Sequence, residues 1–130
     1  MKNISNYKFF NEGRISNAIK SDIIKIKYNR TEFMMSIVNN DMSRFRELIK
    51  ISDLEEIDKY GNTALMISCS EGRLSMVKML LRYGANIHHK NKKGEDFYDM
   101  SLKDKSFFKS VKKYIENNYP EFVVSKKYNI

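Results

Sequence analysis

Few residues of this sequence have side chains that could do covalent or metal chemistry. Among its 130 residues are one cysteine, Cys69, and two histidines, the adjacent His88 and His89. A cysteine nucleophile needs a base beside it, and a closed zinc site needs four ligands. The chain also lacks the G-x-x-x-x-G-K-S/T pattern of a phosphate-binding loop. We therefore expect no catalytic residues, no metal, no cofactor and no enzyme activity, with Cys69 packed inside and both histidines solvated in a turn.

Lysine side chains are the second group of residues that could have a chemical role. The chain carries 24 basic and 16 acidic residues, and the basic excess lies in residues 1–30 and 101–130. The lysines crowd one turn and the last helical segment, with aromatic residues nearby: Lys90, Lys92, Lys93, Lys109, Lys112, Lys113, Lys126, Lys127, Phe107, Phe108, Tyr114 and Tyr128. Lysines bind phosphates and aromatic rings stack on bases, so nucleic-acid binding through this turn and the C-terminal helix is one interpretation. The other is that the charges only keep the protein soluble.

Length and composition limit the architecture that positions these residues. A chain of 130 residues with 42% hydrophobic and 31% charged residues is expected to form one folded domain. One proline and five glycines leave few chain breakers, which favours helices joined by short turns. No apolar run approaches the roughly eighteen residues of a membrane span, and the first residues lack the apolar stretch of a secretion signal. We therefore expect an intracellular, cytoplasmic protein that does not enter a membrane.

Residues 58–90 contain the clearest copy of a repeat that is about 33 residues long. Thr63 is placed to cap a first short helix, and Gly72 offers the positive φ that closes a corner. A second helix is expected because apolar residues recur at three- and four-residue spacing, at Leu74, Val77, Leu80 and Leu81. Gly84 is expected to end this helix in the left-handed conformation.

Fainter copies of this unit lie on both sides of it. A shift of 32 residues toward the N-terminus places Thr31 on Thr63 and Asn40 on Gly72, and asparagine also tolerates a left-handed turn. A shift of 33 residues toward the C-terminus places Gly94 on Gly61. A two-helix hairpin cannot bury its apolar side alone. Hairpins near residues 31–49, 63–81 and 97–115 are therefore expected to stack side by side.

The central unit resembles an ankyrin repeat, whose pattern is D-x-x-G-x-T-P-L-H-x-A followed by a second helix that ends L-L-x-x-G-A-D-V-N. The matching positions are Asp58, Gly61, Thr63, Leu65, Gly72, Val77, Leu80, Leu81, Gly84, Ala85 and Ile87. Four positions depart, with Ala64, Met66, Asn86 and His88 in place of proline, histidine, aspartate and asparagine, which keeps the helix start and loosens the hydrogen bonding. The resemblance implies an all-α fold, an ankyrin-repeat solenoid of stacked helix-turn-helix units with degenerate capping units at both ends.

We expect a single domain, residues 1–130, made of consecutive parts. They are an N-terminal cap or half-repeat at 1–28, a degenerate repeat at 29–57, the well-formed repeat at 58–90, a C-terminal capping repeat at 91–117 and a tail at 118–130. A cap is expected because a stack must cover the apolar surface of its end. Apolar residues of the cap and of the tail are expected to fold over the two ends, namely Phe9, Phe10, Ile15, Ala18 and Ile19, and Phe122, Val123 and Val124.

The resemblance implies a protein-binding module, either an adaptor or an inhibitor. In ankyrin stacks the second helices form a convex back, while the turn tips and first helices form the concave groove that grips the partner. The positions that vary in the family are the expected contacts, namely Lys59, Tyr60, Asn62, Ile67, Ser70, Glu71, Lys90, Lys92, Lys93 and Glu95. Tyr60 is the best anchor, because a partly exposed aromatic ring gives a large contact area at low ordering cost.

The chain is also similar to the small ankyrin proteins of large DNA viruses, phages and intracellular bacteria, through its bias toward Lys, Asn, Ile and Tyr. This likeness implies a host–virus interaction, with a host protein as the partner in the host cytoplasm or nucleus. A stack of this size offers only a modest interface. We expect a monomer, with a weak homodimer as the alternative because an uncapped end is adhesive.

Overall fold

The computed structural model describes residues 16–129, which form eight α-helices and no β-strand. The helices are α2 (Asn17–Tyr28), α3 (Glu32–Val38), α4 (Met42–Leu48), α5 (Ala64–Ser70), α6 (Leu74–Arg82), α7 (Phe97–Ser101), α8 (Lys105–Asn118) and α9 (Pro120–Tyr128). None of the helices in residues 16–129 is long and apolar enough to cross a membrane. The all-α fold expected from the sequence is confirmed.

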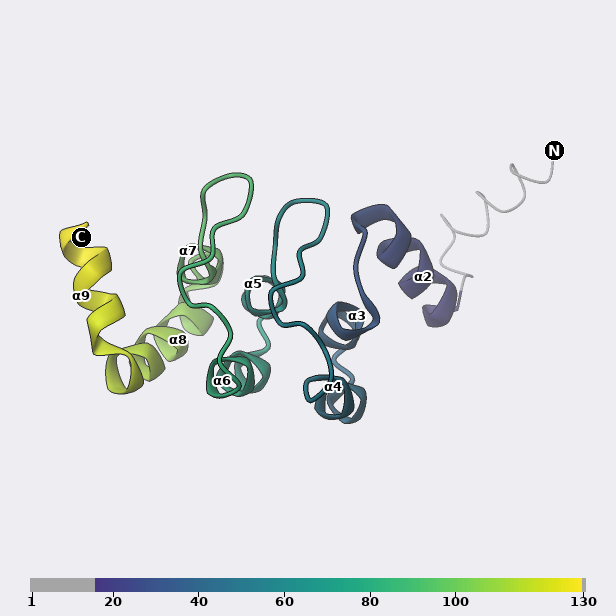
Figure 1. Ribbon diagram of the computed structural model, residues 1–130, viewed down its shortest axis with the longest axis horizontal. Helices are drawn as coiled ribbons and strands as arrows, with labels where there is room; N and C mark the ends of the chain where they lie inside the picture. The colour runs from purple at the N-terminus through teal and green to yellow at the C-terminus, as the bar shows by residue number, and fades with distance from the viewer. Residues whose placement is uncertain (1–15, 130) are drawn as a thin grey trace.

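Six of the helices pair into three hairpins, α3 with α4, α5 with α6 and α7 with α8. The first helices of the hairpins form one row along the molecule, and the second helices form another row beside it (Figure 1). In the first row α5 packs between α3 and α7, and in the second row α6 packs against α8. The three hairpins expected from the repeat therefore stack side by side.

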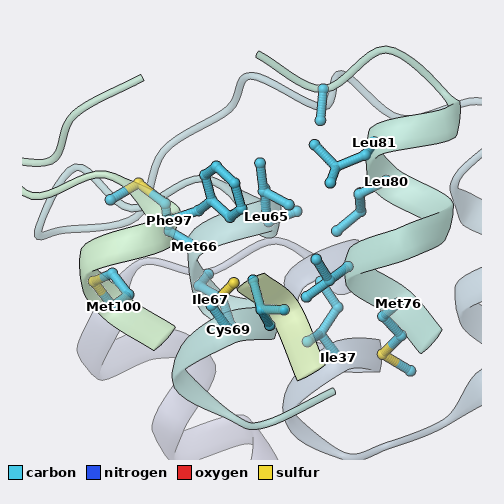
Figure 2. Packing of buried hydrophobic residues seen from close by; sticks show 14 of the residues in the cluster. Ile37, Leu65, Met66, Ile67, Cys69, Met76, Leu80, Leu81, Phe97 and Met100 are labelled. Atoms are coloured by element: carbon cyan, nitrogen blue, oxygen red, sulfur yellow. The ribbon is translucent and has the colours of Figure 1, made fainter. Parts of the chain in front are cut away.

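The core is a continuous layer of buried side chains shared by neighbouring hairpins. Leu65, Met66 and Ile67 of α5 are each 1% exposed, with Ile37 of α3 and Phe97 of α7 on either side (Figure 2). Helix α6 contributes Met76, Val77, Leu80 and Leu81. Because each short first-row helix buries side chains against both neighbours, apolar burial holds the hairpins together.

Left-handed residues make the corners where the repeat predicts them. Asn40 closes the corner between α3 and α4 with φ 54°, and Gly72 closes the corner between α5 and α6 with φ 71°. Gly84 follows α6 with φ 91°. The predicted roles of these three residues are confirmed.

Arg73 links two hairpins through hydrogen bonds that the repeat pattern does not predict. Its guanidinium donates hydrogen bonds to the carbonyl oxygens of Ile37, at 3.1 Å, and Val38, at 3.0 Å. These carbonyls lie in the last turn of α3, where backbone acceptors have no partner within the helix. One side chain at the start of α6 therefore satisfies the end of α3.

Thr63, the predicted cap, and Thr31, which falls on it in the preceding repeat, behave differently. Thr31 caps α3, because its hydroxyl accepts a hydrogen bond of 3.1 Å from the backbone N–H of Met34. Thr63 makes no such cap on α5, and its buried Oγ1 has no hydrogen-bond partner. The prediction for Thr63 is therefore wrong. Position 66, where the family carries a histidine, holds Met66, whose thioether is only a weak acceptor.

The ends of the stack differ from the expected cap and tail. In the part read as a tail, Pro120 starts α9. Phe122 is buried, as expected of a residue that covers the end, whereas Val124 is exposed. At the other end Ala18 and Ile19 lie on α2 and are exposed instead of packed on the first repeat. Helix α2 is followed at once by the turn at Asn29 that leads to α3. Helix α2 therefore does not occupy the position of a second helix of a hairpin. The expectations for Phe9, Phe10 and Ile15 lie outside the described residues.

Candidate protein-binding surface

Two loops stand out from the helix rows, and their tips are built in the same way (Figure 1). In one tip the Asp58 carboxylate accepts hydrogen bonds from the backbone N–H groups of Tyr60 and Asn62, at 2.9 and 3.0 Å. In the next tip the Asn91 side-chain oxygen accepts from the N–H groups of Lys93 and Glu95, also at 2.9 and 3.0 Å. A short polar side chain thus fixes the turn in each case.

Backbone hydrogen bonds join neighbouring tips into one edge. The Lys59 N–H donates to the carbonyl oxygen of Tyr28 at 2.8 Å, and the Lys92 N–H donates to the carbonyl oxygen of Tyr60 at 3.0 Å. Tyr28 ends α2 and is followed by Asn29, whose φ of 52° matches the left-handed Gly61 of the next tip. The chain therefore has three connected tips, at residues 27–29, 59–61 and 92–94.

Tyr60 is the aromatic residue most accessible on this edge. Its side chain is 44% exposed, and its ring centre lies 5.7 Å from that of Tyr28. The Arg30 guanidinium lies 4.9 Å from the Tyr28 ring centre and pairs with the buried carboxylate of Asp58. Tyr28 is thus half-buried, whereas the Tyr60 side chain is exposed.

A shallow groove of about 300 Å³ lies between the second and third tips. It is lined by Tyr60, Asn62, Ser70, Asn91, Lys92, Lys93, Glu95, Met100 and Lys103. Six of the predicted contact residues are therefore brought together in one concave place. Lys59, Glu71 and Lys90 do not line the groove, but all three are exposed beside it.

Ile67 and Asn62 behave differently from the other predicted contacts. Ile67 is 1% exposed and belongs to the core, because α5 packs between α3 and α7 and has no free side at this position. Asn62 is 8% exposed, and its side-chain oxygen accepts a hydrogen bond of 2.9 Å from the Asn91 amide. Asn62 thus connects two tips, and Ile67 is corrected from a surface contact to a core residue.

The groove also contains three residues that sequence reasoning missed. Asn91 falls on Asp58 under the 33-residue repeat, so its role in the turn could have been read from the sequence. Met100 lies on α7 and Lys103 follows that helix. Under the 33-residue shift Met100 falls on Ile67 and Lys103 on Ser70, two of the predicted contacts, so the repeat could have pointed to both.

The histidines and the cysteine do not form a reactive constellation. His89 Nε2 lies 2.9 Å from the carbonyl oxygen of Gly61, so this ring joins two repeats and is not merely solvated as expected. His88 is exposed, with its ring centre 5.7 Å from that of Phe122. Cys69 is buried, and burial raises the pKa of its thiol far above the ordinary value. In residues 16–129 no group of three His, Cys, Asp or Glu side chains is placed to hold a metal.

Comparison with known proteins decides the family. A sequence model of ankyrin repeats matches residues 10–91. The chain belongs to the ankyrin-repeat family. The resemblance inferred from residues 58–90 is thereby confirmed, and ankyrin repeats are protein-interaction modules. The matched range ends just before α7 and α8, which form the third hairpin.

Two relatives of this ankyrin-repeat chain match over short stretches. The DNA replication inhibitor plutonium of Drosophila melanogaster is 45% identical over 47 residues, which are 36% of this chain and 27% of that protein. The alpha-latroinsectotoxin-Lt1a of Latrodectus tredecimguttatus is 34% identical over 55 residues, 42% of this chain and 4% of the toxin. The chain thus spans only a small part of the length of either relative.

Proposed function

We propose that this ankyrin-repeat chain is a non-catalytic adaptor or inhibitor that grips one partner protein in the groove between its second and third tips. The observation that carries the proposal is the meeting of six predicted contact residues, Tyr60 among them, in that groove. One relative is named as an inhibitor of DNA replication, which supports the inhibitor form of the proposal by analogy only.

The construction of the tips favours binding. Side-chain and backbone hydrogen bonds hold the turns before a partner arrives, so little conformational entropy is lost when the partner binds. Tyr60 is anchored on Tyr28 and offers a large amphipathic surface with few rotatable bonds. The neighbouring amide, hydroxyl and ammonium groups supply polar contacts around it.

We propose that the chain catalyses no reaction and that its partner lies inside a cell. Cys69 is the only thiol of the chain, and its side chain packs between α5 and its neighbours as a small apolar group. A lone buried thiol suits a reducing compartment, where disulfides are rare. A host protein as the partner follows only from the likeness in composition to viral and bacterial ankyrin proteins.

The aromatic residues of the C-terminal segment weaken the nucleic-acid alternative. Phe107, Phe108 and Tyr114 pack against the buried core, so their faces are not free to stack on bases. Tyr128 is 62% exposed, but it lies at the end of α9. Lysines without open aromatic faces bind phosphate only as point charges.

The test compares two tyrosines with similar exposure. A partner captured from the native cellular background is identified by mass spectrometry, purified and titrated against the chain by calorimetry. Tyr60→Ala should weaken binding by about 30-fold, the loss of a typical interface anchor. Tyr83→Ala, which changes a 49% exposed tyrosine at the end of α6, should leave the affinity unchanged. Equal affinities of the Tyr60→Ala variant and the unmodified chain would contradict the proposal.

A further inference from the structure

The three tips carry lysines at equivalent positions. Lys27, Lys59 and Lys92 occupy the same place in successive tips, each two residues before the left-handed Asn29, Gly61 or Gly94. All three lysines are exposed, and Lys93 adds a further exposed ammonium group to the third tip. The edge formed by the connected tips thus presents a row of cations that the fold repeats once per hairpin.

The fold does not neutralise this row. Within residues 16–129 the ion pairs involve other cations, and Lys27, Lys59, Lys92 and Lys93 take part in none. Of their own contacts, Lys27 lies over the Tyr28 ring, and Lys92 Nζ donates to the carbonyl oxygen of Lys59 at 2.7 Å.

The acidic groups nearest the tips have other partners. The Asp58 carboxylate is buried and pairs with Arg30. The half-buried Glu95 accepts a hydrogen bond from the Asn91 amide at 3.3 Å. Neither carboxylate forms an ion pair with a lysine of the row.

We propose that this row selects an acidic segment of the partner, which lies extended across the three tips with its carboxylates facing Lys27, Lys59 and Lys92. The proposal rests on the proposed protein-binding function and adds the chemistry of the partner. Opposite charge along a shared edge sets the orientation and the association rate of such a segment.

The repeat also sets the spacing of the acidic residues. Packed helices lie about 8–10 Å apart, so the lysines of successive hairpins recur at about that distance. A segment in the extended polyproline II conformation advances about 3.1 Å per residue and has about three residues per turn, so every third side chain faces the same edge and about three residues span one hairpin. The preferred segment therefore carries Asp or Glu at every third position over roughly seven residues.

A peptide fits this edge better than a nucleic acid. The Tyr28 ring is covered by Lys27, Arg30 and Tyr60, and the Tyr60 ring leans on Tyr28. Neither ring offers two open faces for stacked bases, which supply much of the affinity for single strands. Single ammonium groups separated by a hairpin's width instead suit separate carboxylates.

The probe is a fluorescein-labelled twelve-residue peptide with glutamate at every third position and glycine or serine between. Its binding to the full chain is followed by fluorescence anisotropy at about 50 and 200 mM salt, because such contacts weaken as the Debye length shortens. A peptide with the same glutamates clustered at one end serves as the control for spacing. The regular peptide should bind at least tenfold more tightly than the clustered one.

Two variants with equal charge loss locate the site. Lys27→Gln/Lys59→Gln/Lys92→Gln should weaken binding of the regular peptide at least tenfold. Lys105→Gln/Lys109→Gln/Lys113→Gln, which changes exposed lysines of α8, should leave it within twofold. Circular dichroism and melting curves check that both variants fold. Equal losses in the two variants would overturn the proposal, because binding would then follow net charge alone.

Two further outcomes also overturn it. One is equal binding of the clustered peptide, which would show that the spacing of the carboxylates does not have to match the spacing of the lysines. The other is tighter binding of a twelve-residue oligothymidine that depends on the same tip lysines. If the captured partner still needs Tyr60 but is indifferent to the tip variant, the acidic segment is wrong while the protein-binding groove stands.

Discussion

At the C-terminal end of the stack, α9 lies against α7 and α8 through buried and paired side chains, whereas α2 at the N-terminal end has no buried residue. Phe122 of α9 is 5% exposed, with ring centres 5.4 and 5.6 Å from those of Phe97 and Tyr98. On α2, Ile19 and Ile26 are 51% and 81% exposed. Among residues 16–129, the helix at the C-terminal end of the stack thus buries an aromatic side chain against its neighbours, whereas the helix at the N-terminal end leaves apolar side chains exposed.

The difference shows what closes a helical stack. A helix lies at each end, so helix formation alone does not cover the end hairpin. At the C-terminal end one aromatic ring fills the space beside α7, and one cation, Lys126, pairs with Asp96 and Asp99 at 2.9 and 3.1 Å. Apolar burial and a partly buried ion pair act together there, whereas α2 has no buried residue and its ion pair, Lys25 with Glu32, is exposed.

The largest effect is expected from removing the buried ring of α9. Phe122→Ala deletes a side chain packed on two aromatic rings, and we expect a loss of about 3 kcal/mol in the free energy of unfolding. Urea denaturation followed by circular dichroism measures the change. Val124→Ala on the same helix, where the side chain is 49% exposed, is the control and should cost less than about 1 kcal/mol. Similar losses in the two variants would show that α9 does not close this end.

The ion pairs of α9 should contribute less than its ring. Lys126→Met leaves the Asp96 carboxylate, 4% exposed, without its cation, and we expect a loss of about 1–2 kcal/mol at neutral pH. The loss is smaller than for a fully buried pair because Lys126 is 32% exposed. Asp96 also keeps its hydrogen bond from the Asp99 N–H.

The pH dependence of stability distinguishes the contribution of the Lys126 ion pairs from the contribution of apolar packing. Burial raises the pKa of Asp99, but hydrogen bonds from the Asp96 backbone and Lys126 outweigh burial and hold the pKa below its usual value. The carboxylate therefore stabilises the fold above its unfolded pKa of about 4, and this contribution is lost as the pH falls through the lowered pKa. Stability measured between pH 6 and about 2 should fall less steeply in Lys126→Met than in the unmodified chain. Parallel curves would mean that Lys126 does not lower the pKa of Asp99.

The hairpins could be predicted because their signals are local. Asn40 and Gly72 lie at corners that need a left-handed residue, and the 32-residue spacing relates them directly. Most residues of the groove could be predicted in the same way, because Tyr60, Lys92 and Glu95 were placed by their position in the repeat. Backbone geometry repeated along a chain is therefore readable from one well-formed copy.

What the sequence could not show depends on neighbours in space. Ile67 occupies a position read as surface, but α7 covers the side of α5 that would be exposed in an isolated hairpin. Residues 118–130 were expected to be a tail, but proline is well suited to the first turn of a helix, and here Pro120 starts α9. His89 bonds the carbonyl of Gly61 across two repeats, a contact with no local signature.

A smaller effect tests whether the weak packing at the N-terminal end of the stack includes the first hairpin. Thr31 caps α3, so Thr31→Val should cost about 1 kcal/mol. Thr63 has the same place in the next hairpin, but its buried hydroxyl has no partner, so Thr63→Val should be neutral or gain up to about 1 kcal/mol. Thermal and urea denaturation of both variants measures the contrast. The reverse ranking would mean that the first hairpin, and not only α2, is the loose part of the stack.

The smallest effect is expected on α2 itself. Ile26 is 81% exposed, so Ile26→Ser should change the free energy of unfolding by no more than about 0.5 kcal/mol. Ile24→Ser, two residues away on the same helix and half-buried, is the matched control and should cost about 1 kcal/mol. A loss of more than about 1 kcal/mol at Ile26 would mean that its side chain is covered in solution. If that loss grows with protein concentration, the cover is a second copy of the chain, because only association makes stability depend on concentration.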